Sequence, residues 1–312
     1  MLITVVSVII ILVATLYFYN QHKFKKVLLF PPKGNFVNVG DIKLHYISKG
    51  DGKPLVFIHG GILTGNDFEK VIDLAAAQGY HAISFDRPGY GYSQRYKDKK
   101  MTPIEQAVLI HDALTQLDVQ KPIIAGHSWS GTMILAYALL YPDEISGIIT
   151  LSAAAYKEGY PAANGDAIST IISIPIIGDF ILNTLLFPLG KIMAEGMLKA
   201  TFNPDPISPA YREDTFLFWL RPGQFKANRE DVLAFAPAAE ELHCRYKQIK
   251  VPMVIVVGEK DPFGVVEQAH RLNRDIPESK LIVIPHIGHM IPQCHPHRVM
   301  EAVYELNFLM HK

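Results

Sequence analysis

The chain has 312 residues, of which 49% are hydrophobic and 19% are charged, and its formal net charge is zero. A chain of this size can bury a large core, and its balanced charge gives no electrostatic reason to expect nucleic acid as a partner. Two cysteines, Cys244 and Cys294, are too few for a disulfide framework. We therefore expect one globular domain with an insertion rather than two independent domains.

The N-terminal stretch, residues 1–19, is almost wholly apolar and carries no charged side chain, and lysines follow it at positions 23, 25 and 26. A helix needs about 20 apolar residues to cross a bilayer, so we predict a transmembrane anchor over residues 1–22 and a linker over 23–34. A cleaved signal peptide is the alternative, but the sequence has neither a basic segment before the apolar run nor a small-residue cleavage site after it. Lysines only on the C-terminal side place the rest of the chain on the cytoplasmic face.

From residue 35 onward, short apolar runs alternate with amphipathic stretches. The runs predict a hairpin that turns at Gly40-Asp41 and six further strands, over residues 55–60, 81–86, 122–126, 147–152, 251–258 and 280–285. Helices are predicted over residues 66–79, 102–117 and 265–274, and from about residues 129 and 297.

Helix boundaries are marked by residues that favour caps. Asn66 could cap the first predicted helix and Gly79 could end it. The second opens with a capping box, Thr102 to Glu105, and has Pro103 at its first position. Buried strands that alternate with helices predict an α/β fold: an eight-stranded, mainly parallel sheet with helices on both faces, formed by residues 35–152 and 250–312.

Residues 153–249 break this alternation, because they have helical patterning and many prolines but no clear strand. We predict a helical cap insertion, which would cover the strand ends where open α/β sheets bind ligands. Residues 168–193 are apolar enough to suggest a second membrane span. Pro175, Asp179 and Pro188 interrupt them, which favours cap helices instead.

The stretch "KPIIAGHSWSG", residues 121–131, contains a candidate nucleophile. A catalytic serine at a sharp turn from strand to helix needs small residues two before and two after it. Ser128 has Gly126 before it and Ser130 after it, whereas Ser130 as nucleophile would be flanked by Ser128 and Thr132. A serine that merely caps the helix is the bland alternative. We expect Ser130 to substitute for a glycine, so that Ser130→Gly leaves activity largely intact and Ser130→Leu damages it.

A base and an orienting acid should follow later strands. His289 follows the strand over 280–285, and Asp261 follows the strand over 251–258. Ser128, Asp261 and His289 thus all lie just beyond the C-terminal ends of predicted parallel strands, where such a sheet gathers its functional groups. For the oxyanion, the backbone N–H of Trp129 would be one donor, and Gly61 in "HGGIL" the other, with Ile62 as a weaker choice.

The segments "FIHGG", "DRPGYGYS", "GHSWSG", "GEKDP" and "GHM" together resemble the capped, serine-dependent members of the α/β-hydrolase superfamily, from about residue 35 to the C-terminus. The order Ser, Asp, His is that of its triad. The resemblance implies Ser128 as nucleophile, Asp261 as acid, His289 as base, and Gly61 and Trp129 as oxyanion donors. Ser130 departs from the pattern G-x-S-x-G. An anchored hydrolase of this layout is similar to membrane-bound monoacylglycerol lipases.

The expected activity is hydrolysis of a lipophilic carboxylic ester, such as a monoacylglycerol, without cofactor or metal. Carbon–carbon bond hydrolases and cofactor-free perhydrolases or haloperoxidases use the same triad and stay open as alternatives. A membrane-tethered binding protein is a further alternative, although such a protein would typically lack a triad member. The expected partners are the ester substrate and the lipid bilayer.

Other polar residues have simpler interpretations. We expect His59 to stabilise its loop, His127 to be structural or to line the pocket, and Asp86 and Arg87 to fix the loop after their strand. The four histidines of "HIGHMIPQCHPH" have a spacing that matches no metal site we can justify.

Overall fold

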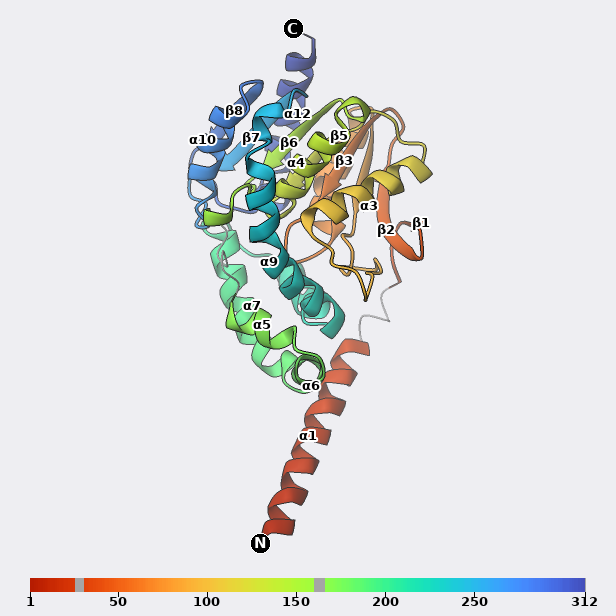
Figure 1. The fold of residues 1–312 in the computed structure, drawn as a ribbon, viewed down its shortest axis with the longest axis vertical. Helices are drawn as coiled ribbons and strands as arrows, with labels where there is room; N and C mark the ends of the chain where they lie inside the picture. The colour runs from red at the N-terminus through yellow and green to blue at the C-terminus, as the bar shows by residue number, and fades with distance from the viewer. Residues whose placement is uncertain (26–30, 160–165, 312) are drawn as a thin grey trace.

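The computed structural model describes residues 1–25, 31–159 and 166–311. Its centre is one eight-stranded sheet with the strand order β1-β2-β4-β3-β5-β6-β7-β8. The strands are β1 (Asn35–Val39), β2 (Ile42–Lys49), β3 (Lys53–Ile58), β4 (Tyr80–Phe85), β5 (Ile123–His127), β6 (Gly147–Leu151), β7 (Met253–Gly258) and β8 (Ser279–Ile284). Only the β1–β2 and β2–β4 pairs are antiparallel. The predicted α/β-hydrolase fold class, with its eight-stranded and mostly parallel sheet, is therefore confirmed (Figure 1).

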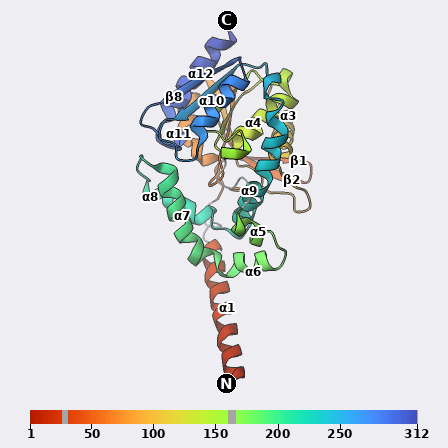
Figure 2. The same cartoon turned by 60° about the vertical axis from the view of Figure 1, so that its left-hand side comes forward.

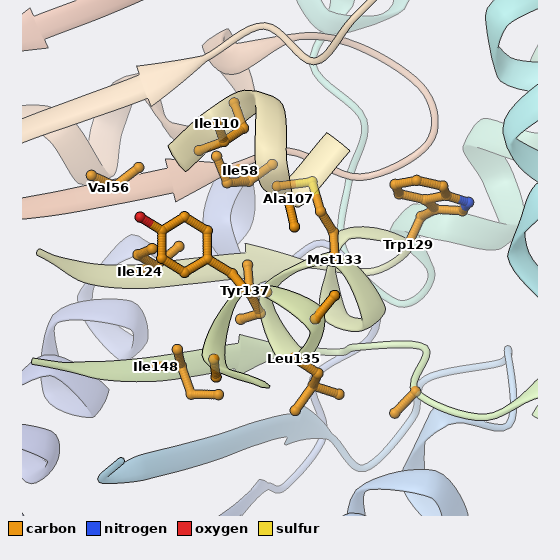
Figure 3. Packing of buried hydrophobic residues seen from close by; sticks show 14 of the residues in the cluster. Val56, Ile58, Ala107, Ile110, Ile124, Trp129, Met133, Leu135, Tyr137 and Ile148 are labelled. Carbon is orange, nitrogen blue, oxygen red and sulfur yellow. The ribbon is translucent and has the colours of Figure 1, made fainter. Parts of the chain in front are cut away.

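Helices cover both faces of this sheet. They are α2 (Glu69–Ala77), α3 (Pro103–Gln116), α4 (Ser130–Leu140), α10 (Val265–Asp275), α11 (Ile291–Cys294) and α12 (Pro296–Met310). Along β3, Val56 and Ile58 join the core that holds α3, α4 and α10, while Leu55 and Phe57 join the core under α2 and α12. This alternation is the period of two that a strand buried on both faces requires. Figure 3 shows Met133 and Tyr137 of α4 packed in the first core.

Most of the helix-capping residues predicted from the sequence are confirmed. The capping box of Thr102 and Glu105 is present at the start of α3, and Gly79, with φ of +80°, follows the end of α2. The prediction that Asn66 caps the first helix is wrong. Thr64 instead accepts a hydrogen bond from the backbone N–H of Asn66 and caps a 3₁₀ turn over Gly65–Phe68, so α2 begins only at Glu69.

The insertion between β6 and β7 contains five α-helices in its described part. They are α5 (Ala167–Ile172), α6 (Ile177–Thr184), α7 (Leu186–Phe202), α8 (Pro209–Phe218) and α9 (Pro222–His243). The expected interruption at Pro188 is misplaced. The chain bends by 80° between α6 and α7, whereas Pro188 lies in the first turn of α7, where the backbone N–H that proline lacks would have no intrahelical partner.

Helix α1 (Leu2–Lys25) projects from the body at the end opposite to the C-terminus (Figures 1 and 2). Its 18-residue window of highest hydropathy averages 2.6, and none of that window is buried, so α1 is long and apolar enough to cross a membrane. A signal sequence would have the same character. The helix extends three residues into the predicted linker 23–34, of which residues 26–30 lie outside the described residues.

Candidate active site

Ser128 lies at the sharp turn between β5 and α4. Its backbone is in the left-handed region, with φ of +54°, which costs energy for a residue with a side chain and is typical of functional sites. Hydrogen bonds hold the turn on both sides: the Ser128 N–H donates to the carbonyl of Leu151 (3.0 Å), and the N–H of Ala154 donates to the Ser128 carbonyl (3.0 Å). The end of β6 therefore fixes the strained conformation.

The turn needs glycine at two positions, and neither of them is position 130. A Cβ at Gly126 would lie 2.8 Å from the carbonyl oxygen of Ser130, and a Cβ at Gly131 would lie 2.4 Å from the Cβ of Ala153. Ser130 is fully buried, and its hydroxyl donates a hydrogen bond of 2.6 Å to the carbonyl of His59. Ser130 is thus a tether between the Ser128 turn and the loop after β3, a role that its small size alone did not predict.

His289 and Asp261 form a buried pair. The two atoms that meet are the Nδ1 of His289 and the Oδ2 of Asp261, at 2.6 Å. Burial by itself would raise the pKa of Asp261, but the adjacent His289 and the backbone N–H of Phe263 outweigh it and lower the pKa of that carboxyl. Asp261 is therefore held as a carboxylate. This carboxylate orients the imidazole of His289 through Nδ1 and leaves the second ring nitrogen, Nε2, available for proton transfer.

Ser128 and His289 line the same pocket, a cavity of about 220 Å³. Its walls are mainly apolar, and the insertion contributes a large part of them: Met197, Thr201, Tyr211, Trp219, Asn228, Arg229 and Val232. In the described part of the chain, no hydrogen bond joins the Ser128 hydroxyl to the His289 ring. Without a bound substrate, the hydrogen bond between a nucleophile and its base is often long or poorly aligned, and it tightens when substrate binds.

Of the two predicted oxyanion donors, one lines this pocket and the other is next to Ser128 in the chain. Gly61 lines it, while Trp129 immediately follows Ser128 at the start of α4. The side chain of Trp129 is buried away from the cavity, where its Nε1 donates to the carbonyl of Asp231 (3.1 Å). Neither the Gly61 N–H nor the Trp129 N–H makes a hydrogen bond among the described residues. Both groups are therefore free to donate to a developing oxyanion.

A buried ionic network under the site was not foreseen from the sequence. Asp231 of α9 accepts a hydrogen bond from Arg87 Nη1 (2.7 Å) and lies 2.9 Å from Arg95 Nη2. The guanidinium of Arg87 also donates to the carbonyl of Gly60 (3.0 Å) and stacks 4.1 Å from the Trp129 ring. One carboxylate of the insertion thereby braces the segments that carry both predicted oxyanion donors.

Asp67 is a pocket residue that sequence reasoning also missed. It is buried, lines the cavity and accepts a hydrogen bond from the hydroxyl of Tyr211 in α8 (2.8 Å). Burial raises the pKa of Asp67 to about 7, against the opposing effect of the Tyr211 hydrogen bond. The only signal in the sequence was an acidic residue soon after "HGG", which an ordinary loop would also show.

His127 is buried and lines the pocket, as we expected. Its Nε2 donates to the backbone carbonyl of His289 (3.0 Å). Burial, followed by the effect of His289, lowers the pKa of His127 to about 3, so its ring is neutral. His59 likewise serves its loop, since its Nε2 accepts a hydrogen bond from the N–H of Arg87 (2.9 Å).

The histidine-rich segment after β8 does not gather into a cluster. His289 pairs with Asp261, whereas His295 pairs with Asp205 (2.9 Å). Within residues 1–25, 31–159 and 166–311, no group of three or more His, Cys, Asp or Glu side chains could hold a metal ion.

Comparison with known proteins agrees with the fold. Residues 53–170 match the family described as the alpha/beta hydrolase fold. The uncharacterized hydrolase YugF of Bacillus subtilis is 27% identical over 270 residues, which cover 83% of this chain and 91% of YugF.

Two solved structures share the fold. A thermophilic esterase from Thermogutta terrifontis superposes with a TM-score of 0.69 at 20% identity, over 89% of this chain and 100% of the esterase. A bromoperoxidase from Bacillus anthracis superposes with a TM-score of 0.70 at 22% identity, over 88% of this chain and 99% of that protein. An esterase and a peroxidase resemble the chain equally well, so the fold leaves the reaction open. The sheet and the matched segment together show the α/β-hydrolase fold, and the matched segment and the relatives support a hydrolase function.

Proposed function

We propose that the protein is a membrane-anchored serine hydrolase that cleaves lipophilic carboxylic esters through Ser128, His289 and Asp261. One observation carries the proposal. Ser128 is held in a strained turn at the same cavity as His289, whose far ring nitrogen is paired at 2.6 Å with a buried carboxylate. A nucleophile, a base and a group that orients the base are the parts that acyl transfer requires.

The steps follow from these positions. His289 Nε2 takes the proton of the Ser128 hydroxyl while the serine oxygen attacks the ester carbonyl. The N–H groups of Gly61 and Trp129 stabilise the oxyanion, and each such donor typically contributes about 10²–10³-fold to kcat. His289 then protonates the departing alcohol. Water, activated by the same ring, releases the acid from the acyl-enzyme and restores Ser128.

The lining of the pocket supports a substrate that has an apolar acyl chain and a polar remainder. Ile62, Met197, Val232, Phe263 and Met290 offer apolar contact along the cavity. Burying each methylene of an acyl chain contributes about 0.8 kcal/mol, so a medium or long chain would gain most. In this proposal the insertion acts as a cap, and a monoacylglycerol or a similar single-chain ester is the substrate class.

We also propose that the protein is anchored in a membrane. Helix α1 would span the bilayer, with the lysines that follow the apolar run on the side of the catalytic domain, which favours the cytoplasmic face. Deleting residues 1–26 should move the protein from the membrane fraction to the soluble fraction. Recovery of the full chain in the soluble fraction would contradict the anchor.

The test of the reaction is hydrolysis of p-nitrophenyl esters of increasing acyl length, followed by a monoacylglycerol panel. We expect kcat/KM to rise from acetate toward medium-length chains. If no ester is turned over while a carbon–carbon substrate or a peroxide-dependent halogenation is, the ester proposal fails and one of the other reactions of this triad replaces it.

A further inference from the structure

Helix α1 and the insertion are joined by one asparagine. Asn20 is fully buried although it lies in an otherwise exposed apolar helix. Its Nδ2 donates to the carbonyl of Thr184, the last residue of α6, and its Oδ1 accepts from the N–H of Phe187 in the first turn of α7 (2.9 Å). Asn20 thus satisfies two backbone groups that the 80° bend between α6 and α7 would otherwise leave without partners.

Neighbouring contacts add to this joint. Gln21 donates to the side chain of Asn183 (3.1 Å), and the rings of Tyr19 and Phe24 pack edge-on against Phe187. An apolar groove continues from the joint along α1 as far as Ile9, with Phe180 of α6 on its other side. Both views place α6 beside α1 where that helix leaves the body (Figures 1 and 2).

The position of α6 relative to a bilayer follows from this packing. A hydrocarbon core about 30 Å thick takes about 20 residues of helix, which is most of α1. The part of α1 that packs against α6 includes Val13 and Tyr17. If α1 spans the membrane, α6 must therefore lie at the depth of one leaflet rather than in bulk water.

The exposed side chains at the bend suit that depth. We define the elbow surface as six large apolar residues, 41–82% exposed, that lie just before α6, on α6 and on the first two turns of α7: Ile174, Ile176, Ile177, Phe180, Leu189 and Ile192. Ile176, which is 82% exposed, also has a φ of +68°, an unfavourable conformation for a β-branched residue. Contiguous exposed apolar groups of this kind mark interaction sites.

Few charged side chains lie near the bend, and those described there contact other side chains. Asp179 pairs with Lys226 (2.9 Å), and Lys191 lies over the ring of Phe216. Further along α7, away from the bend, charged side chains follow: the half-buried Glu195, which pairs with Arg212, and the exposed Lys199. Apolar groups near the bend and charged groups beyond it match the change from acyl chains to headgroups and water.

We propose that the elbow surface is a second membrane contact, inserted into the lipid of a phospholipid bilayer and held at its depth by the Asn20 joint to α1. Helix α7 leads from Ile192, at this surface, to Thr201, which lines the catalytic pocket, a distance of about 14 Å at 1.5 Å per residue. A lipid ester could thus reach Ser128 from the bilayer. The docking rests on α1 as a membrane span, and the delivery of substrate rests also on the proposed ester hydrolysis.

Lipid contact can be measured without any catalysis. In the full chain with Cys244→Ala and Cys294→Ala, one cysteine is placed by Ile177→Cys and labelled with the fluorophore NBD, and the protein is reconstituted in phosphatidylcholine vesicles that contain doxyl-labelled lipid. We expect blue-shifted emission and strong quenching. Tyr304→Cys is the matched control, because Tyr304 is an exposed ring of α12, the helix at the end of the molecule opposite to α1 (Figure 1). It should show neither effect.

Adding Asn20→Ala should remove most of the quenching at position 177 while the protein remains in the membrane. Equal quenching at positions 177 and 304 would overturn the proposal. So would a blue shift at 177 without lipid quenching but with cross-linked dimers, since a second copy would then cover the surface. Loss of the full chain from the vesicles would instead refute the anchor on which the docking rests.

A kinetic experiment tests whether the ester substrate reaches Ser128 from the bilayer. The double variant Ile177→Asp, Phe180→Asp should lower hydrolysis of a monoacylglycerol embedded in vesicles and leave hydrolysis of soluble p-nitrophenyl butyrate unchanged. Equal loss on both substrates would contradict delivery from the bilayer. If wild-type protein hydrolyses neither ester, the proposed function fails, and the quenching result still decides the docking.

Discussion

Asp231 offers the clearest test of how the insertion supports the active site. The carboxylate lies between Arg87 and Arg95, and the side chains of Arg87 and Asp231 are 0% and 1% exposed. Asp231→Ala would remove the buried carboxylate that the two guanidinium groups share, and Arg87 would keep only uncharged acceptors, Gln106 and the carbonyl of Gly60. Breaking a buried pair by removing one partner typically costs about 3–5 kcal/mol, so we expect a loss of that size in the free energy of unfolding.

The matched control is Asp73→Ala. Asp73 also pairs with a basic residue, Lys49, at 2.8 Å, but the two side chains are 58% and 59% exposed, and such pairs contribute about 0–1 kcal/mol. Urea unfolding of the full chain in mild detergent, followed by tryptophan fluorescence, measures both variants. Equal losses for Asp231→Ala and Asp73→Ala would refute the view that Asp231 is an essential brace.

Activity gives a second measurement of the same variant. Arg87 connects Asp231 to the carbonyl of Gly60 and to the Trp129 ring, and a shift of about 1 Å in a catalytic group can cost about 10²-fold. We expect kcat to fall in Asp231→Ala even at temperatures where the protein remains folded. Asp231→Asn, which keeps the shape of the side chain, should lose less of both quantities. Unchanged kcat in folded Asp231→Ala would contradict the link between Asp231 and the predicted oxyanion donors.

Two further predictions concern Ser130 and Asp67. Ser130→Gly and Ser130→Ala each leave the buried carbonyl of His59 without its donor, so both should lose about 1–3 kcal/mol of unfolding free energy, measured by urea unfolding; no loss would show that the tether is dispensable. The pKa of Asp67 is raised to about 7 from an ordinary 3.8. Between these two pH values the folded state holds a proton that the unfolded state has released. The free energy of unfolding should therefore fall as pH rises from about 4 to 7 and level off above pH 7. Asp67→Asn should flatten that fall, whose full size is about 4 kcal/mol, and an unchanged pH profile of unfolding would contradict it.

The elements that the sequence predicted well depend on local patterns. Apolar runs and turn residues located the eight strands, because β3 to β7 carry unbroken buried runs, while β1 and β2 alternate and flank a glycine turn. Ser128, Asp261 and His289 could be found because each follows a strand of a parallel sheet, so topology alone brings them to one edge. Their catalytic roles stay a prediction, as does the division of the chain into anchor, core and cap.

The features that the sequence did not predict depend on contacts between distant segments. Arg87 and Asp231 are 144 residues apart, and Asn20 and Phe187 are 167 apart, so no spacing rule connects them. Ser130 shows the same limit at short range. Its size was recognised, but the hydrogen bond to His59 depends on how β3 and β5 lie side by side in the sheet.

The central claim is that Ser128 is the nucleophile, and a fluorophosphonate probe, which bonds covalently to activated serines, tests it most directly. The wild-type protein and Ser130→Ala should both be labelled, and Ser128→Ala should not. Labelling that persists in Ser128→Ala, at the level of the wild type, would contradict the assignment of Ser128 and with it the proposed reaction.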